Sequence, residues 1–393
     1  MTRLFIACRA VDLLYFSLVS CAAGVNDDTM GPDESNGDAL MGSGGALGTG
    51  VLGGGTGGAS TGGIGGTGAN SSSVGSGGVS RSGGATSTGG TLATGGSIAG
   101  TSDLPLLGAF VAVTNGQEPQ YWDKVIVQMA ALQMKVAIVQ TESYLVPGSN
   151  GRNAVTTDRL QAVLDAGARE GVEIWMGVAL PERGNGDLTL AKDANFIDGV
   201  VAATKTSADL VNSRFKNSRA WAGWYLPLEF WTPDESGLGE LPRYVDEGSA
   251  YLKSVNDLPV LVSPFISTLG VDPQLTESAF TSLLLAADVD VVALQDGVGA
   301  RKISAGDLSV RVTPWLEAVQ RACESAGCET WLNGESFYGV APSVAALPSN
   351  FSQQLAVATS RSVPAISFEF SNYWLLSNGE PGALFNWYAA LAP

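Results

Sequence analysis

Eight short apolar runs between Leu104 and the C-terminus limit most strongly what this chain can fold into. The runs lack a strict alternation of apolar and polar residues, which is typical of strands buried on both faces of a parallel sheet. We therefore predict eight β-strands. They cover Leu106–Val113, Lys135–Gln140, Glu173–Ala179, Ala222–Pro227, Pro259–Pro264, Val289–Gln295, Glu329–Asn333 and Ala365–Phe370.

Amphipathic helical patterns alternate with these runs, and the last pattern closes the chain. Eight βα units in about 290 residues predict one α/β domain over residues 104–393, a (β/α)₈ or TIM barrel. A doubly wound open sheet is the alternative, but no G-x-G-x-x-G motif follows a strand in this region. The predicted helices cover Trp122–Met134, Thr156 to about Gly167, Asp198–Ser213, Leu241–Val255, Thr276–Ala287, Leu308–Ala326, Phe351–Ser360 and Leu384–Leu391.

A glycine-rich segment precedes the predicted barrel. Between Met41 and Gly100, 25 of 60 residues are Gly, and most others are Ser, Thr and Ala. Such a composition buries too little apolar surface to offset the entropy of ordering the chain. We therefore expect residues 22–103 to be a disordered linker with a reach on the order of 50 Å.

The first 21 residues have the pattern of an export signal, with a positive charge at Arg3 and an apolar run over Leu13–Val19. Leu18-Val19-Ser20-Cys21 resembles a bacterial lipobox, which implies lipidation of Cys21 and an outer-membrane or cell-surface location. An ordinary cleaved secretory peptide, or a later start codon, is the alternative. After residue 21 the sequence has no stretch of about 20 apolar residues of the kind that predicts a membrane span.

Two cysteines flank the junction between the predicted helix Leu308–Ala326 and the next strand: Cys323 stands in the last turn of the helix and Cys328 just before the strand. In an oxidising compartment they would form a short disulfide, and two unpaired thiols are the alternative. Neither has a basic neighbour in sequence that would activate a catalytic thiolate.

Charge and composition exclude several functions. The net charge of −17, with no cluster of Lys or Arg, argues against nucleic acid and against direct binding to anionic lipid. The chain has no histidine, which rules out Ser-His-Asp and Cys-His catalysis and His-containing zinc sites. Acid–base chemistry must then come mainly from carboxyl groups, and we expect a monomer that needs no metal or cofactor.

Carboxylates stand at or just past five of the eight predicted strand ends, where (β/α)₈ barrels carry their active sites. Aromatic side chains, whose flat faces suit sugar rings, accompany most of them. The candidates are Glu142 and Tyr144 after the second strand, Glu229 and Trp231 after the fourth, Gln295 and Asp296 at the sixth, Glu335 and Tyr338 after the seventh, and Glu369 and Trp374 after the eighth.

A pair of carboxyl groups on opposite sides of a sugar is what hydrolysis of a glycosidic bond requires. Strands four and seven face each other across a barrel, so Glu229 and Glu335 are the predicted pair. This layout resembles clan A of the glycoside hydrolases, in which strand four carries the acid/base and strand seven the nucleophile. Those enzymes usually have Asn before the strand-four Glu, where this chain has Leu228. We predict a retaining mechanism. The other carboxylates, Gln295 and the aromatic residues are predicted to contact the substrate.

The whole barrel resembles a bacterial family catalogued as domain of unknown function 4434, a glycoside-hydrolase-like TIM barrel. Gly223-Trp-Tyr-Leu-Pro-Leu-Glu229, Leu294-Gln-Asp-Gly-Val-Gly299 and the aromatic residues after Glu335 carry the resemblance. These motifs indicate the fold but say little about the substrate. Together with the export signal and the carboxylate pair, the resemblance leads to the hypothesis of an exported glycoside hydrolase acting on a poly- or oligosaccharide.

Other interpretations of the same residues stay open. Glu229 and Asp296 could instead be structural, with Asp296 capping its glycine-flanked turn. Glu369 is the main alternative to Glu335 as the second carboxylate of the pair. A barrel that binds glycan without cleaving it is the second functional hypothesis. A divalent-metal enzyme using Glu142, Asp296 and Glu369 is the third.

Overall fold

The computed structural model describes residues 106–114, 116–140, 157–178, 192–230, 237–266, 272–301, 303–339 and 343–391. The predicted signal sequence with Cys21 and the predicted linker over 22–103 lie outside these residues. So do three of the predicted site residues, Glu142, Tyr144 and Trp231.

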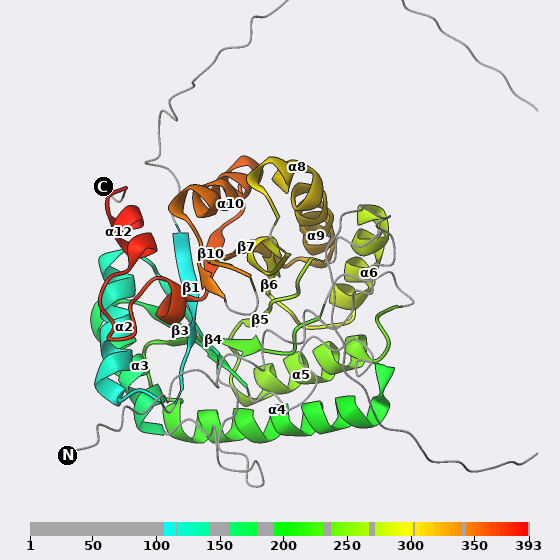
Figure 1. The fold of residues 1–393 in the computed structure, drawn as a ribbon. Coiled ribbons are helices and arrows are strands. Elements are labelled where there is room, and N and C mark those ends of the chain that lie inside the picture. Colours follow the sequence, from blue (N-terminus) through cyan, green and yellow to red (C-terminus); the bar gives the residue numbers. More distant parts are fainter. Residues whose placement is uncertain are drawn as a thin grey trace, which may run out of the picture. The chain divides into compact units, whose positions relative to one another are not determined.

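All eight predicted strands form and close into one parallel barrel, which confirms the predicted (β/α)₈ fold. Each strand pairs with its neighbours in sequence order, and the last strand, β10, pairs with β1 to close the ring. Figure 1 shows the strands surrounded by helices. The barrel strands are β1 (Leu106–Ala112), β2 (Val136–Gln140), β3 (Glu173–Gly177), β4 (Trp221–Leu226), β5 (Val260–Val262), β6 (Val291–Gln295), β7 (Glu329–Glu335) and β10 (Ala365–Phe368).

The long helices occupy the predicted segments. One predicted helix, Leu308–Ala326, is divided in two, because Val312 leaves helical geometry and the following Pro314 has no N–H to continue the ladder. Among the helices of the described ranges, none is long and apolar enough to cross a membrane. The helices are α2 (Pro119–Ala131), α3 (Thr157–Glu170), α4 (Ala194–Phe215), α5 (Leu241–Val255), α6 (Pro273–Leu285), α8 (Leu308–Arg311), α9 (Thr313–Ala326), α10 (Pro348–Arg361) and α12 (Ala383–Ala389).

Several short elements are additions to the sequence prediction, and most of them follow β6, β7 and β10. They are too short for a hydrophobic period to reveal them. They are α7 (Val298–Arg301), the 3₁₀ turn η4 (Ala305–Asp307), the two-stranded hairpin of β8 (Phe337–Tyr338) and β9 (Val344–Ala345), and α11 (Phe370–Tyr373).

Side chains fill the inside of the barrel, so the strands enclose a core and the chemistry must lie at the strand ends. Phe110 packs edge-on against Tyr225 with ring centroids 5.1 Å apart, and Trp175 packs against Trp331 at 5.6 Å. A larger apolar layer lies between the outer faces of the strands and the helices. This two-sided burial explains why the strands read as continuous apolar runs.

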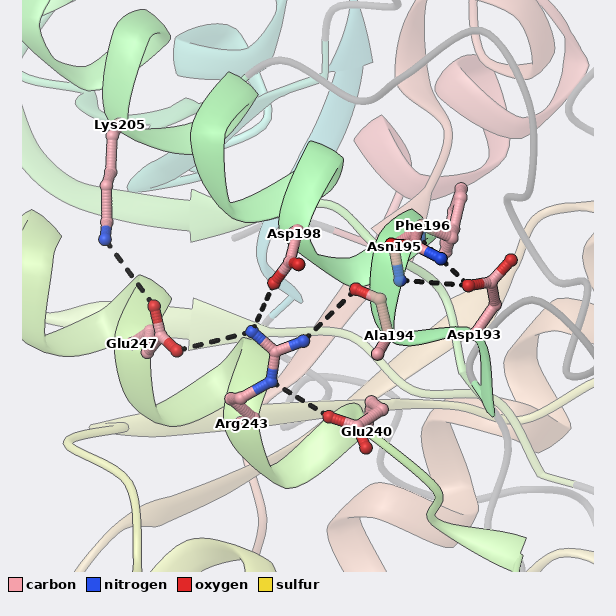
Figure 2. Close-up of polar contacts among 9 residues, drawn as sticks. All are labelled: Asp193, Ala194, Asn195, Phe196, Asp198, Lys205, Glu240, Arg243 and Glu247. Atoms are coloured by element: carbon pink, nitrogen blue, oxygen red, sulfur yellow. Dashed lines mark hydrogen bonds and ion pairs between the residues drawn. The ribbon is translucent and has the colours of Figure 1, made fainter.

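A polar network centred on Arg243 joins the first turns of α4 and α5 (Figure 2). The guanidinium donates to Asp198 Oδ1 at 2.7 Å and to Glu240 Oε2 at 2.9 Å. These helices are the ones that follow β3 and β4 in the chain, so the network joins two neighbouring helices at their N-terminal ends. Ala194, Glu247 and Lys205 extend the network, and Asp193 caps α4 beside it.

Cys323 and Cys328 are free thiols in this structure, and the disulfide expected in an oxidising compartment stays a prediction. The two side chains are in hydrogen-bond contact, because the turn at Gly327 (φ 83°) brings residue 328 back toward the end of α9. The Cys328 backbone N–H donates to the Cys323 carbonyl at 3.1 Å. The alternative of two unpaired thiols is the one that the structure shows.

Candidate active site

The two predicted catalytic carboxyl groups stand at the C-terminal ends of β4 and β7. Trp331, Asn333 and Glu335 alternate along β7, and Trp331 belongs to the barrel interior, so Glu335 also faces inward. Glu229 follows β4 by three residues, between Leu228 and Phe230, which pack in the outer core. Its side chain therefore points toward the barrel mouth. Both carboxyl groups are buried, with Glu229 7% exposed and Glu335 3% exposed.

The segment that carries Glu229 is fixed to the neighbouring strand end. The Phe230 carbonyl accepts a hydrogen bond from the Phe265 backbone N–H at 2.8 Å. The Gln295 amide donates to Glu229 Oε1 at 3.4 Å and to the Ser263 carbonyl at 2.9 Å. Gln295 thus holds the carboxyl group of Glu229 directly, and its predicted contact with substrate stays a prediction.

Burial raises the pKa of Glu229 to about 7. The hydrogen bond from Gln295 opposes this change, since it favours the charged form, and the nearby charge of Glu335 adds to it. The interaction between the two carboxyl groups shows that the fold brings Glu229 and Glu335 together, although 106 residues separate them in sequence. A carboxyl group with a pKa near 7 can hold a proton and release it at neutral pH.

Glu335 has a different environment, rich in backbone donors and acceptors. Its Oε2 accepts the backbone N–H of Ala300 at 2.6 Å. Its own backbone N–H donates to Asp296 Oδ1 at 3.3 Å, and its carbonyl accepts from the Gln354 amide at 3.3 Å. A donated N–H favours the charged form of the carboxyl group.

Two polar residues that lie near the two carboxyl groups, Asn333 and Ser263, were not predicted from the sequence. Asn333 donates to Ser263 Oγ at 3.1 Å, and Ser263 donates to the Ala293 carbonyl at 2.8 Å. Asn333 could have been found from the alternation on β7, because it lies two residues before Glu335 and so shares its face. Ser263 has no comparable signal, since it follows a three-residue strand.

Asp296 caps its turn through Oδ1, as the alternative considered for it supposes, while its Oδ2 is buried without a hydrogen-bond partner, and its contact with substrate stays a prediction. The residue is 1% exposed, and its Oδ1 accepts the backbone N–H groups of Val298 at 3.0 Å and Glu335 at 3.3 Å. Burial, and next the charge of Glu335, hold the pKa of Asp296 well above its usual range.

Glu369 is also structural, so it is not a rival to Glu335. Its Oε1 accepts the backbone N–H groups of Ala112 at 3.0 Å and Ser371 at 2.8 Å, and its Oε2 accepts that of Asn372 at 3.0 Å. The Ser371 hydroxyl also donates to Oε1. Glu369 therefore caps α11 and joins β10 to β1. Burial raises its pKa, while these hydrogen bonds oppose the change.

Two of the aromatic residues predicted to contact the substrate, Trp374 and Tyr338, lie in the described ranges, and the structure places one in the core and the other at the surface. Trp374 is 0% exposed, stacks on Phe370 and donates from Nε1 to Ser367 Oγ at 2.9 Å, so it cannot meet a sugar and that prediction is wrong. Tyr338 is 42% exposed on β8, three residues after Glu335. Its contact with substrate stays a prediction.

Replacing Trp374 with phenylalanine tests the core assignment. We expect Trp374→Phe to lower the free energy of unfolding by about 2 kcal/mol, because a buried serine hydroxyl loses its donor and a smaller ring leaves a void. KM should not change, because no sugar contacts this ring. Urea unfolding and steady-state kinetics measure the two effects. A raised KM with unchanged stability would restore Trp374 as a substrate contact.

The described residues form no group of three or more His, Cys, Asp or Glu side chains placed to bind a metal ion. What the site offers is two buried carboxyl groups in unequal environments. Glu229 is suited to carry a proton, and Glu335 accepts a backbone N–H, a contact that favours the charged form of a carboxyl group.

Solved structures with a similar fold are glycosidases by description. A putative α-L-fucosidase from Bacteroides thetaiotaomicron has a TM-score of 0.59 and 16% identity, covering 76% of this chain and 99% of the other. An endo-β-1,4-mannanase from Thermotoga petrophila has a TM-score of 0.51 and 12% identity, covering 73% and 76%. A β-galactosidase from the psychrophilic Marinomonas ef1 has a TM-score of 0.51 and 8% identity, covering 72% and 58%. At these identities the likeness shows a glycoside-hydrolase-like barrel fold alone.

No curated protein matches the sequence. One family model, described as "Domain of unknown function (DUF4434)", matches residues 113–383, which are 271 of the 393 residues. The match covers α2 to α11 and both carboxyl groups of the site. This chain therefore belongs to the DUF4434 family.

Proposed function

We propose that this protein hydrolyses glycosidic bonds, with Glu229 as general acid/base and Glu335 as nucleophile. The observation that carries the proposal is the pairing of two buried carboxyl groups on β4 and β7, which interact electrostatically but have different partners. Pairs of titratable groups with unequal environments are how glycosidases assign an acid and a charged partner.

Glu229 fits the role of the acid. A general acid works best when its pKa is close to the working pH, and burial brings the pKa of Glu229 to about 7. The hydrogen bond from Gln295 is long, at 3.4 Å, and it opposes the effect of burial only in part, so the protonated form is accessible at neutral pH.

Glu335 fits the role of the nucleophile, because the Ala300 N–H supports its negative charge. In the first step Glu335 attacks the anomeric carbon, the glycosidic C–O bond breaks, and Glu229 gives its proton to the leaving oxygen. In the second step Glu229 takes a proton from water, which attacks the anomeric carbon and releases Glu335. The net configuration is retained, and the two steps need no cofactor.

The comparisons support a carbohydrate substrate only as a class. The three similar structures are described as acting on fucosides, mannan and galactosides, so the shared fold does not favour one sugar. Leu228 is buried in the outer core, so this chain has no polar side chain where clan A enzymes usually have asparagine. Its contacts to the sugar must therefore differ from theirs on the β4 side.

The experiment is a screen of aryl glycosides and polysaccharides, followed by ¹H NMR of the first-formed product. We expect hydrolysis with retention of anomeric configuration. Glu173→Gln is the matched control, because Glu173 is exposed at the start of β3, at the opposite end of the barrel. Inversion would contradict the role of Glu335. Tight glycan binding without any product would favour a non-catalytic glycan-binding barrel.

Tyr338 provides a test of where the substrate lies. We expect Tyr338→Ala to raise KM about tenfold with little change in kcat, because one aromatic face no longer covers the sugar and about 1.4 kcal/mol of binding is lost. Tyr338→Phe keeps the ring and should restore KM. Measured kinetics of the two variants on one substrate decide the point, and an unchanged KM in Tyr338→Ala would remove Tyr338 from the site.

A further inference from the structure

We propose that the turn over residues 296–300 is a device that positions Glu335, and that its backbone N–H at Ala300 keeps the Glu335 carboxylate charged and correctly oriented. The inference rests on the proposed function, because it gives this turn a role in holding the nucleophile. The turn follows β6 and includes the start of α7, whereas the residue that it positions lies on β7.

The first contact fixes the backbone of Glu335. Asp296 Oδ1 accepts two N–H groups, one from Val298 in the same turn and one from Glu335 on β7. A single oxygen atom thus joins the start of α7 to the amide of Glu335. The adjacent strands continue the link, because the Asp296 N–H donates to the Asn333 carbonyl at 3.1 Å.

The second contact fixes the side chain of Glu335. The first N–H groups of a helix have no partner within the helix and must be satisfied from outside. In α7 the N–H of Val298 is taken by Asp296, and the N–H of Ala300 by Glu335 Oε2 at 2.6 Å. The start of α7 thereby donates one N–H to Asp296, which also holds the backbone of Glu335, and another N–H to the Glu335 carboxylate.

The third contact sets how close the turn lies to β7 and β8. Gly299 lies against the chain after Glu335, and a Cβ built on it would be 2.2 Å from the Phe337 carbonyl oxygen. The Gly299 carbonyl accepts the Gly339 N–H at 2.9 Å. Gly297 has φ 66°, a backbone conformation that favours glycine.

These contacts account for a motif that the proposed chemistry does not use. The Asp-Gly-Val-Gly sequence over 296–299 provides the anchoring carboxylate, the left-handed turn and the close approach, in that order. The turn meets residues 335, 337 and 339, every second residue of the segment that carries the nucleophile. Asp296, Gly299 and Ala300 are positioning residues, since each acts through Glu335.

Two changes test the turn in the full chain. Gly299→Ala adds a methyl group that backbone atoms must move to accommodate, which draws Ala300 N away from Glu335. Gly306→Ala is the matched control, because the nearest atom to its added methyl would be 3.9 Å away. Replacing Ala300 by lactate, an amide-to-ester change, removes only the N–H and keeps the shape, so it tests the proposal even if Gly299→Ala does not fold.

The first readout does not depend on catalysis. ¹³C NMR follows the titration of the Glu335 carboxyl carbon, assigned by its loss in Glu335→Gln. We expect the midpoint to rise by about one pH unit in Gly299→Ala and in the ester variant, because a hydrogen bond to the charged form is lost, and to stay unchanged in Gly306→Ala. An unchanged midpoint in both altered turns would overturn the inference.

The second readout is kinetic and separates the two proposals. We expect kcat to fall about 10- to 100-fold in both altered turns with KM nearly constant, because a misplaced nucleophile slows the chemical step. If the midpoint shifts in the two altered turns but Glu335→Gln keeps full activity, the turn positions Glu335 and Glu335 is not the nucleophile. Loss of activity in Glu335→Gln with unshifted midpoints supports the nucleophile and refutes the turn's role.

Discussion

Replacing Glu335 with glutamine is expected to lower kcat/KM by about 10⁴-fold or more, the largest effect that the structure predicts. Removing the nucleophile of a two-step mechanism abolishes the covalent intermediate, and such deletions cost on the order of 10⁴ to 10⁶ in rate. Glutamine has nearly the same shape, and its carbonyl oxygen can still accept the Ala300 N–H that now meets Oε2. The fold should therefore be unchanged. Steady-state kinetics and circular dichroism measure the two quantities.

A second variant distinguishes a missing nucleophile from a disturbed site. In Glu335→Ala, a small anion such as azide can occupy the space of the carboxylate and attack the anomeric carbon from the same side. We expect azide to restore turnover and to give a glycosyl azide of inverted configuration. Rescue without that product, or turnover of Glu335→Gln within tenfold of the original chain, would contradict the assignment.

The barrel was predictable because its physics is local and repetitive. A parallel strand covered on both faces must be apolar along its length, and a covering helix must be apolar on one side. These requirements recur eight times after residue 104, and the strands form where the patterns predict them. Once the barrel was predicted, the ends of β4 and β7 followed, so Glu229 and Glu335 could be paired from sequence.

The roles of the other carboxylates were not predictable, because they depend on distant backbone groups. Glu369 is fixed by the N–H of Ala112, which lies 257 residues earlier in the chain. Asp296 is fixed partly by the N–H of Glu335, 39 residues later. A sequence shows that a carboxylate stands at a strand end, but not whether a backbone donor on the next strand already occupies it.

The prediction that Trp374 contacts the substrate was wrong for a related reason. It stands six residues after the end of β10, where a loop residue and a core residue look alike in sequence. The short helix α11, which Glu369 caps, turns the chain back and places the indole against Phe351 and Phe370. Four-residue helices of this kind carry no period that a sequence pattern could reveal.

Replacing Glu229 with glutamine is expected to lower kcat/KM by about 10²- to 10⁴-fold for substrates with poor leaving groups, the second largest effect. Substrates whose leaving groups need no proton should lose much less. In the unaltered protein, activity should fall as the pH rises through about 7, because Glu229 must be protonated to act as an acid. The basic limb of the pH–rate profile should disappear in Glu229→Gln. A basic limb that stays in place would assign it to another group.

The same substitution should stabilise the protein at high pH. Burial raises the pKa of Glu229 from 4.5 to about 7, so between these values the folded chain holds a proton that the unfolded chain has lost. Stability must then fall as the pH rises through this window, by about 1.4 kcal/mol per unit and about 3 kcal/mol in all. Glutamine removes that cost. Urea unfolding should therefore show Glu229→Gln more stable than the original chain at pH 8 by up to about 3 kcal/mol, with the difference vanishing near pH 4 and Glu173→Gln showing no such trend. Equal stabilities at pH 8 would mean that Glu229 ionises in the folded protein at little cost, and it would then be poorly suited to act as the acid.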